Sequence, residues 1–281
     1  TAGADWRPAI ARRVAQLDRQ SASGRAPEAF ARMMKFEAAR LRYHLAHDVR
    51  PDVLTGPAFC RAFAGSGSVL LLPLLVAIFA SDLVSAELSE GTLPLLLTRP
   101  VSRWKILVSK LLAMALFTTL TIAAAVAMAY LVGSVPFGWK GFGAPMLGGF
   151  RLGEGGIDPD LVRVIPLWQD TLAAWGLAWY ASICVGTISV LLSILFRAAA
   201  AAMGTMMATL VAGTILSRIA SDWVGAKWLF VSCLPLAEFY AGVPPPVPGM
   251  TLGFCAAVLG GWACAALLAS FLIFTKRDVT A

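Results

Sequence analysis

Long apolar runs, separated by short clusters of charge, dominate this chain of 281 residues. Hydrophobic residues make up 58% of it, charged residues only 14%, and the mean hydropathy is +0.75. One water-soluble globule of this length cannot bury so much apolar surface. The charged fraction is also well below the roughly one quarter that is usual in soluble domains. The pattern predicts an all-α fold, a polytopic membrane helix bundle.

Five of the apolar runs are long enough to cross a bilayer as helices. They cover about 69–86, 106–132, 171–196, 198–217 and 251–274. Small residues recur at every fourth position of the fourth run, which predicts the close approach of a neighbouring helix. They are Ala200, Gly204, Ala208 and Ala212. Between the spans, we expect an irregular loop from 133 to about 166 and a dipping, interfacial helix over 221–230.

Residues 1–65 are predicted to form a separate helical segment. One helix is expected over 6–19, and apolar residues at three-and-four spacing from Phe30 to Leu45 predict a second, amphipathic helix. The two would pack as a hairpin outside the membrane. A sensor that lies among the lipid headgroups is the alternative.

Basic residues indicate which side of the membrane each connection faces. Lys276 and Arg277 follow the last span, and the first connection carries Arg103, Lys105 and Lys110. The positive-inside rule places both in the cytoplasm, so five spans put the N-terminal hairpin on the extracytoplasmic side. The hairpin is itself basic, but the rule weakens for long translocated segments. We attribute the net charge of +7 to headgroup contacts rather than to nucleic acid.

The first connection also contains an ordered set of polar residues and turn formers. In chain order, the set consists of Asp82, Glu87, Glu90, Gly91, Thr92, Arg99, Pro100, Ser102, Arg103 and Lys110. It resembles the ABC-2 type transporter permease family, in which an aspartate ending a membrane helix precedes a glutamate, a Gly-Thr pair, a Leu-rich Pro-Val-Ser-Arg stretch and a lysine. Ala86 and Ser109 depart from it, since glycine is common at both positions. The resemblance covers about residues 66–281.

This resemblance implies the membrane subunit of an ATP-driven exporter with six spans, of which the first would precede Thr1. The transmembrane domain would be 66–281, with a cytoplasmic connection at 86–105 whose ten residues named above couple it to an ATPase. The implied partners are ABC ATPase subunits that hold ATP and Mg, a second permease chain, identical or related, and membrane lipid. The implied location is the plasma (inner) membrane of a prokaryote.

The residues of the connection support such a role on physical grounds. Glu90, Gly91 and Thr92 would break the incoming helix, a short helix could restart over 93–97, and Pro100 would stop it. Its leucines would fit a groove of a soluble partner, with charges at the rim. The basic residues alone favour an ordinary cytoplasmic loop that follows the positive-inside rule, and the ordered match to the family favours the coupling role.

The sequence contains no Gly-x-x-x-x-Gly-Lys-Ser/Thr phosphate loop, so we expect no enzymatic activity from this chain alone and ATP hydrolysis in another subunit. Two other functions compete with the exporter. An ion-driven secondary transporter would require ionisable residues deep in the membrane. A non-transporting membrane anchor or sensor would use the hairpin as its working part.

A few further residues carry alternative roles. Asp82 could carry protons, although its place at the end of a span favours ordering of the connection. Glu238 could gate a substrate, although a solvated loop carboxylate is the simpler interpretation. His44 and His47 beside Asp48 favour polar surface over a metal site, and we predict no metal centre. Cys60 and Cys233 could form a disulfide, whereas Cys184, Cys255 and Cys264 are interpreted as packing residues.

Overall fold

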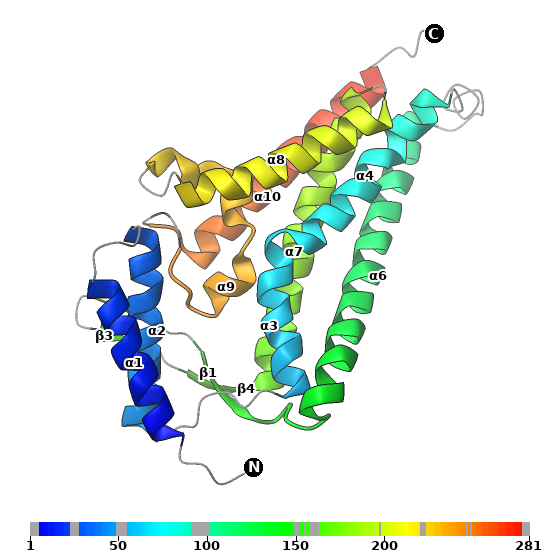
Figure 1. The fold of residues 1–281 in the computed structure, drawn as a ribbon. Coiled ribbons are helices and arrows are strands. Elements are labelled where there is room, and N and C mark those ends of the chain that lie inside the picture. Colours follow the sequence, from blue (N-terminus) through cyan, green and yellow to red (C-terminus); the bar gives the residue numbers. More distant parts are fainter. Residues whose placement is uncertain are drawn as a thin grey trace.

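The computed structural model describes residues 6–22, 28–48, 55–90, 102–148, 152–153, 156–157, 163–196, 198–219, 223–245, 247 and 249–276. Helices dominate this part of the chain (Figure 1). The long helices are α1 (Arg7–Ala22), α2 (Glu28–Ala46), α3 (Gly56–Val69), α4 (Leu71–Ser89), α6 (Arg103–Phe137), α7 (Leu167–Leu195), α8 (Ala199–Ile219) and α10 (Leu252–Lys276). The short elements are β1 (Pro145–Gly148), β2 (Leu152–Gly153), β3 (Gly156–Ile157), β4 (Arg163–Pro166), the 3₁₀ helices η2 (Val224–Trp228) and η3 (Phe230–Cys233), and α9 (Leu236–Tyr240).

Several helices are long and apolar enough to cross a membrane, which confirms the predicted membrane helix bundle. Four qualify on their own among the described residues: Arg103–Phe137, Leu167–Leu195, Ala199–Ser217 and Leu252–Thr275. A fifth span arises only if α3 and α4, which meet at an angle of 51°, count as one broken span. The described residues therefore contain four to five candidate membrane-spanning helices, as expected of a multi-pass membrane protein.

The first predicted span differs most from the observed structure. It was expected as one helix from 69 to 86, but α3 already begins at Gly56, before the expected boundary at 66. Thr55 caps α3, since its hydroxyl accepts a hydrogen bond from the N–H of Ala58 at 3.3 Å. At Leu70 the backbone leaves helical geometry (φ −135°), and α4 restarts at once in a new direction. Pro73 falls in the first turn of α4, where its missing N–H is tolerated.

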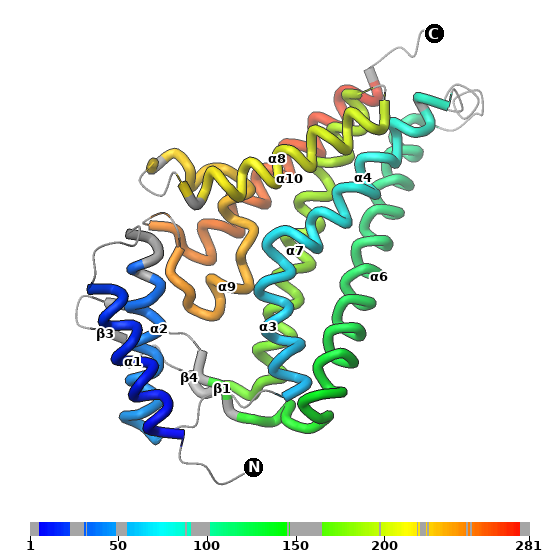
Figure 2. Tube along the Cα trace, viewed as in Figure 1, coloured from blue at the N-terminus to red at the C-terminus, as the bar shows by residue number. Residues whose placement is uncertain are grey.

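Helix α7 forms the centre of the bundle. Of its most apolar stretch, 67% is buried, against 17% for α6 and for α8. It packs against α3, α4 and α10, which surround it in both ribbon and tube views (Figures 1 and 2). Gly186 lets α6 and α4 approach α7 closely, because a Cβ there would lie 2.6 Å from the sulfur of Met114 on α6 and 3.1 Å from Val76 on α4.

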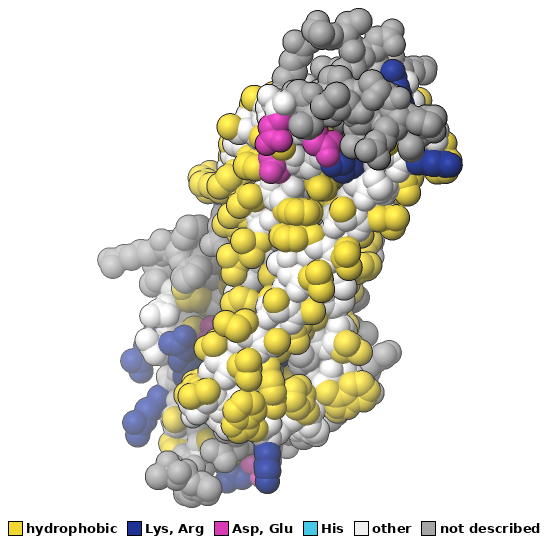
Figure 3. Space-filling view, turned by 90° about the vertical axis from the view of Figure 1, so that its right-hand side faces the viewer, with side chains coloured by type: hydrophobic (Ala, Val, Ile, Leu, Met, Phe, Trp, Pro, Cys, Tyr) yellow, Lys and Arg dark blue, Asp and Glu magenta, His cyan; other side chains and the backbone are white. Residues whose placement is uncertain are grey.

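Helix α6 presents its outer face to the membrane. Its exposed side chains are large and apolar, among them Leu112, Leu116, Leu120, Met128 and Leu131. Figure 3 shows hydrophobic side chains over the middle of this face, with charged side chains gathered towards its two ends. An apolar band between polar ends is the surface that a bilayer stabilises.

The stripe of small residues on α8 faces outward as well. Ala200, Gly204, Ala208 and Ala212 are all exposed, and a Cβ on Gly204 would meet nothing within 4 Å. The expected close approach of a neighbouring helix is therefore not made by the described part of this chain. Helix α8 packs instead against α4 and α7 through its opposite face, which includes Ala202, Met206 and Leu210.

The connections between spans are more ordered than the sequence indicated. Strand β1 pairs with β4 in an antiparallel ladder that runs from Pro145 opposite Pro166 to Gly148 opposite Arg163, and β2 pairs with β3. The prediction of an irregular loop is wrong for these residues. Where one interfacial helix was expected over 221–230, the described residues form the short 3₁₀ helix η2 and the start of η3, and the interfacial position stays a prediction.

The N-terminal helices pack against each other beside the bundle (Figure 1). Leu17, Met34 and Ala38 form their small apolar interface. Three exposed ion pairs surround it: Arg7 with Asp48 (2.6 Å), Arg13 with Glu37 (3.3 Å) and Arg42 with Asp18 (2.6 Å). The predicted helical pair is present, and its extracytoplasmic location stays a prediction.

Candidate functional site

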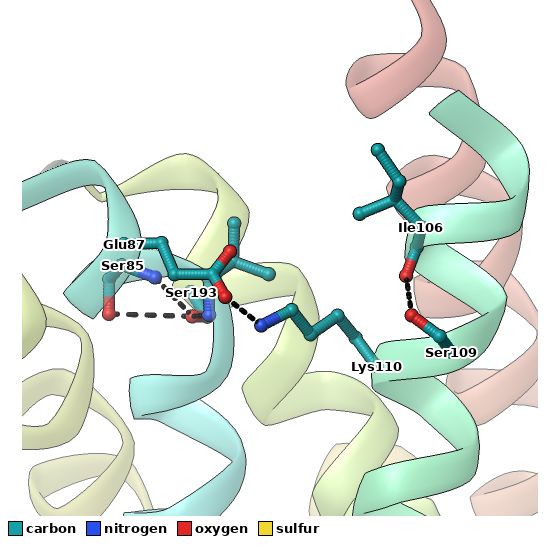
Figure 4. A network of polar contacts seen from close by, with 7 residues as sticks. Ser85, Glu87, Ile106, Ser109, Lys110 and Ser193 are labelled. Carbon is teal, nitrogen blue, oxygen red and sulfur yellow. Dashed lines mark hydrogen bonds and ion pairs between the residues drawn. The ribbon is translucent and has the colours of Figure 1, made fainter. Parts of the chain in front are cut away.

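The predicted coupling residues gather at the end of the bundle where α4 ends and α6 begins. The ammonium of Lys110 on α6 donates a hydrogen bond to the carboxylate of Glu87 on α4 (Figure 4). The side chains of Lys110 and Glu87 are 19% and 25% exposed, so the pair is partly hydrated. It ties together the two helices that the connection joins.

Hydroxyl groups from α7 support the last turns of α4 next to this pair. The hydroxyl of Ser193 accepts hydrogen bonds from the backbone N–H groups of Val84 (3.0 Å) and Ser85 (2.9 Å). Ser85 in turn donates to the carbonyl of Ser81 at 2.6 Å. These contacts are buried, and they fix α4 against the centre of the bundle. Nothing in the sequence distinguished Ser193 from other hydroxyl residues of the spans.

The remaining predicted residues lie at the same end or outside the described part. Asp82 is half-buried on α4, and Glu90 is exposed at its end, where its N–H reaches the carbonyl of Ala86 at 2.9 Å. Ser102 caps α6 through its backbone, and Arg103 lies half-buried in the first turn. Gly91, Thr92, Arg99 and Pro100, and with them the short helix expected over 93–97, lie outside the described residues.

A second ion pair, which sequence reasoning missed, lies at the opposite end of the bundle. The guanidinium of Arg61 on α3 donates to the carboxylate of Asp170 in the first turn of α7, and it also reaches the carbonyl of Ala237 at 3.5 Å. Arg61 is only 5% exposed and Asp170 only 2%. Asp170 also lies at a helix N-terminus, where the helix dipole favours a negative charge. Arg61 and Asp170 are far apart in the sequence, so no local sequence pattern predicts that they form a pair.

The other candidates of the sequence have structural roles. The ring of His47 bonds to the carbonyl of Tyr43 at 3.1 Å, while Asp48 pairs with Arg7. No group of three potential metal ligands occurs within the described ranges. Glu238 is half-buried on α9, not a solvated loop residue.

The cysteines do not form the disulfide considered above. All five are free, and Cys60 and Cys233 lie in different apolar clusters. The thiol of Cys60 lies against the carbonyl of Val126 at 3.8 Å, and that of Cys233 against the carbonyl of Lys227 at 3.5 Å. A hydrogen bond with Cys255, together with burial, raises the pKa of Cys233, so it stays a protonated thiol.

Several long apolar helices packed around a buried central one, with ion pairs at both ends, define a multi-pass membrane protein. The chain belongs to the family described as "Protein of unknown function (DUF2705)", whose model matches residues 35–280. The match begins within α2 and includes the whole bundle and both ion pairs.

Two proteins of Bacillus subtilis (strain 168) are similar to this chain. "Uncharacterized protein YhcI" is 30% identical over 239 residues, which cover 84% of this chain and 74% of that protein. "Uncharacterized membrane protein YdbK" is 26% identical over 213 residues, which cover 75% and 78%. The second name agrees with the membrane assignment, and neither name specifies an activity.

Proposed function

We propose that the chain is the transmembrane permease subunit of an ATP-driven ABC-2 type exporter, which couples ATP hydrolysis by a partner subunit to the movement of a substrate across the membrane. The observation that carries the proposal is the convergence of Asp82, Glu87, Glu90, Arg103 and Lys110 at one end of the bundle, around the turn from α4 to α6. Four of them, Asp82, Glu87, Arg103 and Lys110, also carry the likeness to the permease family.

The physical argument concerns what this end offers to a soluble partner. Glu87 and Lys110 form an ion pair with each other, so they hold α4 and α6 together. The exposed Glu90 and the first turn of α6 flank the connection at its rim. Charges at a rim fix the register of docking and raise the rate of encounter. A partner that moves on ATP binding would then shift α4 and α6 as a unit and tilt the helices packed on them.

The remaining features of the proposal follow the same reasoning. ATP and Mg would belong to the ABC ATPase subunits, since this chain has no phosphate loop. A second permease chain would complete the translocation pathway, with lipid around both chains. The plasma membrane of a prokaryote fits the bacterial relatives, and the hairpin of α1 and α2 would lie on its outer side.

An ion-driven secondary transporter is the second candidate, and one observation favours it. Arg61 and Asp170 form a buried ionisable pair within the helix bundle, and such groups mark ion pathways in many transporters. Coupling to ATP or to an ion gradient is therefore the distinction that an experiment has to make.

Co-purification with the ATPase encoded by a neighbouring gene tests the proposal. We expect the two subunits to elute as one complex, and Glu90→Arg together with Arg103→Glu to reduce its yield or to uncouple ATP hydrolysis from transport. The matched control, Arg12→Glu in the hairpin, is expected to leave both unchanged. The proposal would be contradicted if the double variant kept full complex yield and full transport while the Arg12 variant lost both. That result would assign energy coupling to the hairpin. Transport that follows an ion gradient without ATPase would favour the second candidate.

A further inference from the structure

A side chain of α7 enters the backbone hydrogen bonds of α4 near the end of that helix (Figure 4). The hydroxyl oxygen of Ser193 lies 3.0 Å from the backbone nitrogen of Val84 and 2.9 Å from that of Ser85, and both N–H groups donate to it. In a regular α-helix, each of these N–H groups would donate to the carbonyl four residues earlier. A side chain inserted in this way is a recognised cause of a kink in a helix. All three residues are almost completely buried, so these bonds form in the interior of the bundle.

The hydroxyl of Ser85 completes this arrangement. It donates to the carbonyl of Ser81 at 2.6 Å, the same carbonyl that a regular helix would offer to the N–H of Ser85. It also accepts a hydrogen bond from the hydroxyl of Ser193 at 3.4 Å. A serine that bonds back to the carbonyl four residues earlier favours bending of its helix. The two N–H groups, this carbonyl and both hydroxyls are therefore hydrogen-bonded around one point of α4.

The two parts of α4 on either side of this point have different partners. On the earlier side, Val76 is fully buried and lies against Gly186 of α7. On the later side, the N–H of Glu90 donates to the carbonyl four residues earlier at 2.9 Å, as in a regular helix. Glu87, in the same last turn, pairs with Lys110 of α6. The body of α4 is therefore held by α7 and its last turn by α6, and Ser193 bonds to the junction between them.

The bonds at this junction can be exchanged without leaving a backbone group unpaired. If the hydroxyl of Ser193 withdraws, the N–H of Ser85 can return to the carbonyl of Ser81, and the N–H of Val84 to that of Ala80. The buried hydroxyl of Ser81 has no hydrogen-bond partner among the described residues, so it is available to the hydroxyl of Ser85. A segment with two hydrogen-bonded arrangements is what a conformational switch requires.

Building on the exporter proposed above, we infer that Ser193 is a latch that sets the position of the last turn of α4. With the latch closed, this turn, which carries Glu87, is held against α7. When the ATPase moves, Ser193 releases the two N–H groups, and α4 straightens at Val84 and Ser85. The last turn then moves with the start of α6, to which Lys110 binds it. The ATPase therefore acts first on this turn rather than on the whole of α4.

Distances between spin labels measure this movement. Nitroxides are attached to p-acetylphenylalanine, which leaves the native cysteines intact. One label replaces Glu90, and the second replaces either Leu172, near the start of α7, or Leu272, near the end of α10; all three positions are exposed. The purified full-length chain is measured in lipid nanodiscs without ATPase. Val84 and Glu90 are separated by about 9 Å along the helix, so loss of a kink of roughly 20° displaces position 90 by about 3 Å.

Three variants test the latch in the chain alone. Ser193→Ala removes it, and we expect at least one of the two mean distances to change by about 3 Å or more. Ser189→Ala is the matched control, since Ser189 is equally buried on α7 but its hydroxyl bonds within that helix, to the carbonyl of Val185 at 2.9 Å. It should leave both distances unchanged. Ser193→Thr keeps the hydroxyl and should keep the distances of the parent. Unchanged distances in Ser193→Ala, or an equal change in Ser189→Ala, would overturn the inference.

The part of Ser193 in coupling is tested separately, on the complex with the ATPase. A non-hydrolysable ATP analogue with Mg should move the distances of the parent chain towards those of Ser193→Ala, which a purely structural serine would not allow. Distances that keep their nucleotide-free values in the assembled complex would overturn this part. Because the first measurements need no ATPase, a latch that responds as predicted would stand even if the co-purification failed, and the complex could form even if Ser193→Ala changed no distance.

Discussion

The two ends of the helix bundle each hold one ion pair between neighbouring helices, but the two pairs differ in their exposure to solvent. Arg61 and Asp170 join α3 to α7, and their side chains are 7% and 3% exposed. Lys110 and Glu87 join α6 to α4, and theirs are 19% and 25% exposed. If the buried pair of Arg61 and Asp170 separates, a charge is left in the interior. If the partly hydrated pair of Lys110 and Glu87 separates, water or another protein can replace the lost partner.

This difference indicates that one end of the bundle has a structural role and the other end is suited to docking. The end with Arg61 and Asp170 is held rigidly, and α9 closes over it through the carbonyl of Ala237. The end with Glu87 and Lys110 borders the connection from α4 to α6 and has the adjustable contacts that a docking surface needs. The predictions below test this contrast through the free energy of unfolding of the purified chain.

The largest effect is expected for the buried pair. Asp170→Ala leaves the guanidinium of Arg61 buried without its carboxylate, which should lower the free energy of unfolding by about 3–5 kcal/mol. Denaturant unfolding in mixed micelles measures it. The double variant Arg61→Met with Asp170→Leu removes both charges and should recover most of the loss. A single variant as stable as the parent would mean that water already reaches this pair.

A steric comparison of two glycines should give the next largest effect. A Cβ on Gly56 would collide with Ser134 and lie 2.9 Å from the carbonyl oxygen of Gly138, so Gly56→Ala should cost about 1–3 kcal/mol. Gly204 on α8 has open space around it, and Gly204→Ala should stabilise the helix by about 0.5–1 kcal/mol. The two thermal unfolding midpoints should therefore move in opposite directions. Shifts of the same sign would show that packing does not distinguish these two positions.

The partly hydrated pair should matter less for stability. Glu87→Gln is expected to lower the free energy of unfolding by no more than about 1 kcal/mol, because water and the remaining contacts of α4 compensate for the lost attraction. The same unfolding assay measures it, with Asp170→Ala as the reference. A loss as large as that of Asp170→Ala would remove the contrast between the two ends.

The smallest effect is expected in the hairpin. Arg13 and Glu37 pair at 3.3 Å with about half of each side chain exposed. Replacing Glu37 by glutamine should change the free energy of unfolding by less than about 0.5 kcal/mol. Hydrogen exchange of the hairpin's backbone amides in this variant should stay close to that in the parent protein. Loss of the whole hairpin's protection would show that its ion pairs, and not Leu17 and Met34, hold it together.

The sequence predicts the spans well because a bilayer requires long apolar runs, and α6, α7, α8 and α10 fall where such runs occur. It fails at α3, where Arg61 interrupts the apolar pattern and resembles a soluble segment. Only the structure shows that Asp170, far along the chain, neutralises this arginine. Local patterns also cannot predict the short ladder of β1 and β4, whose partners are separated in the chain by residues 149–162.

For the candidate site, the sequence grouped the residues into one connection but did not show their mutual contacts. Glu87 was expected to pair with a partner subunit, and Lys110 was predicted only as a coupling residue, whereas the two bind each other. Antiparallel packing of α4 and α6 brings them together, and spacing alone does not reveal it. Glu238 was interpreted as a solvated loop carboxylate in preference to a substrate gate, but it is half-buried on α9, a short helix that the sequence did not predict.

Photo-cross-linking tests most directly whether the turn from α4 to α6 receives the ATPase. Benzoylphenylalanine replaces Glu90 at this turn or, as the matched control, the equally exposed Gln16 of the hairpin, and native membranes that contain both subunits are irradiated. The account predicts a cross-link to the ATPase from position 90 and none from position 16. A cross-link from position 16 with none from position 90 would contradict it.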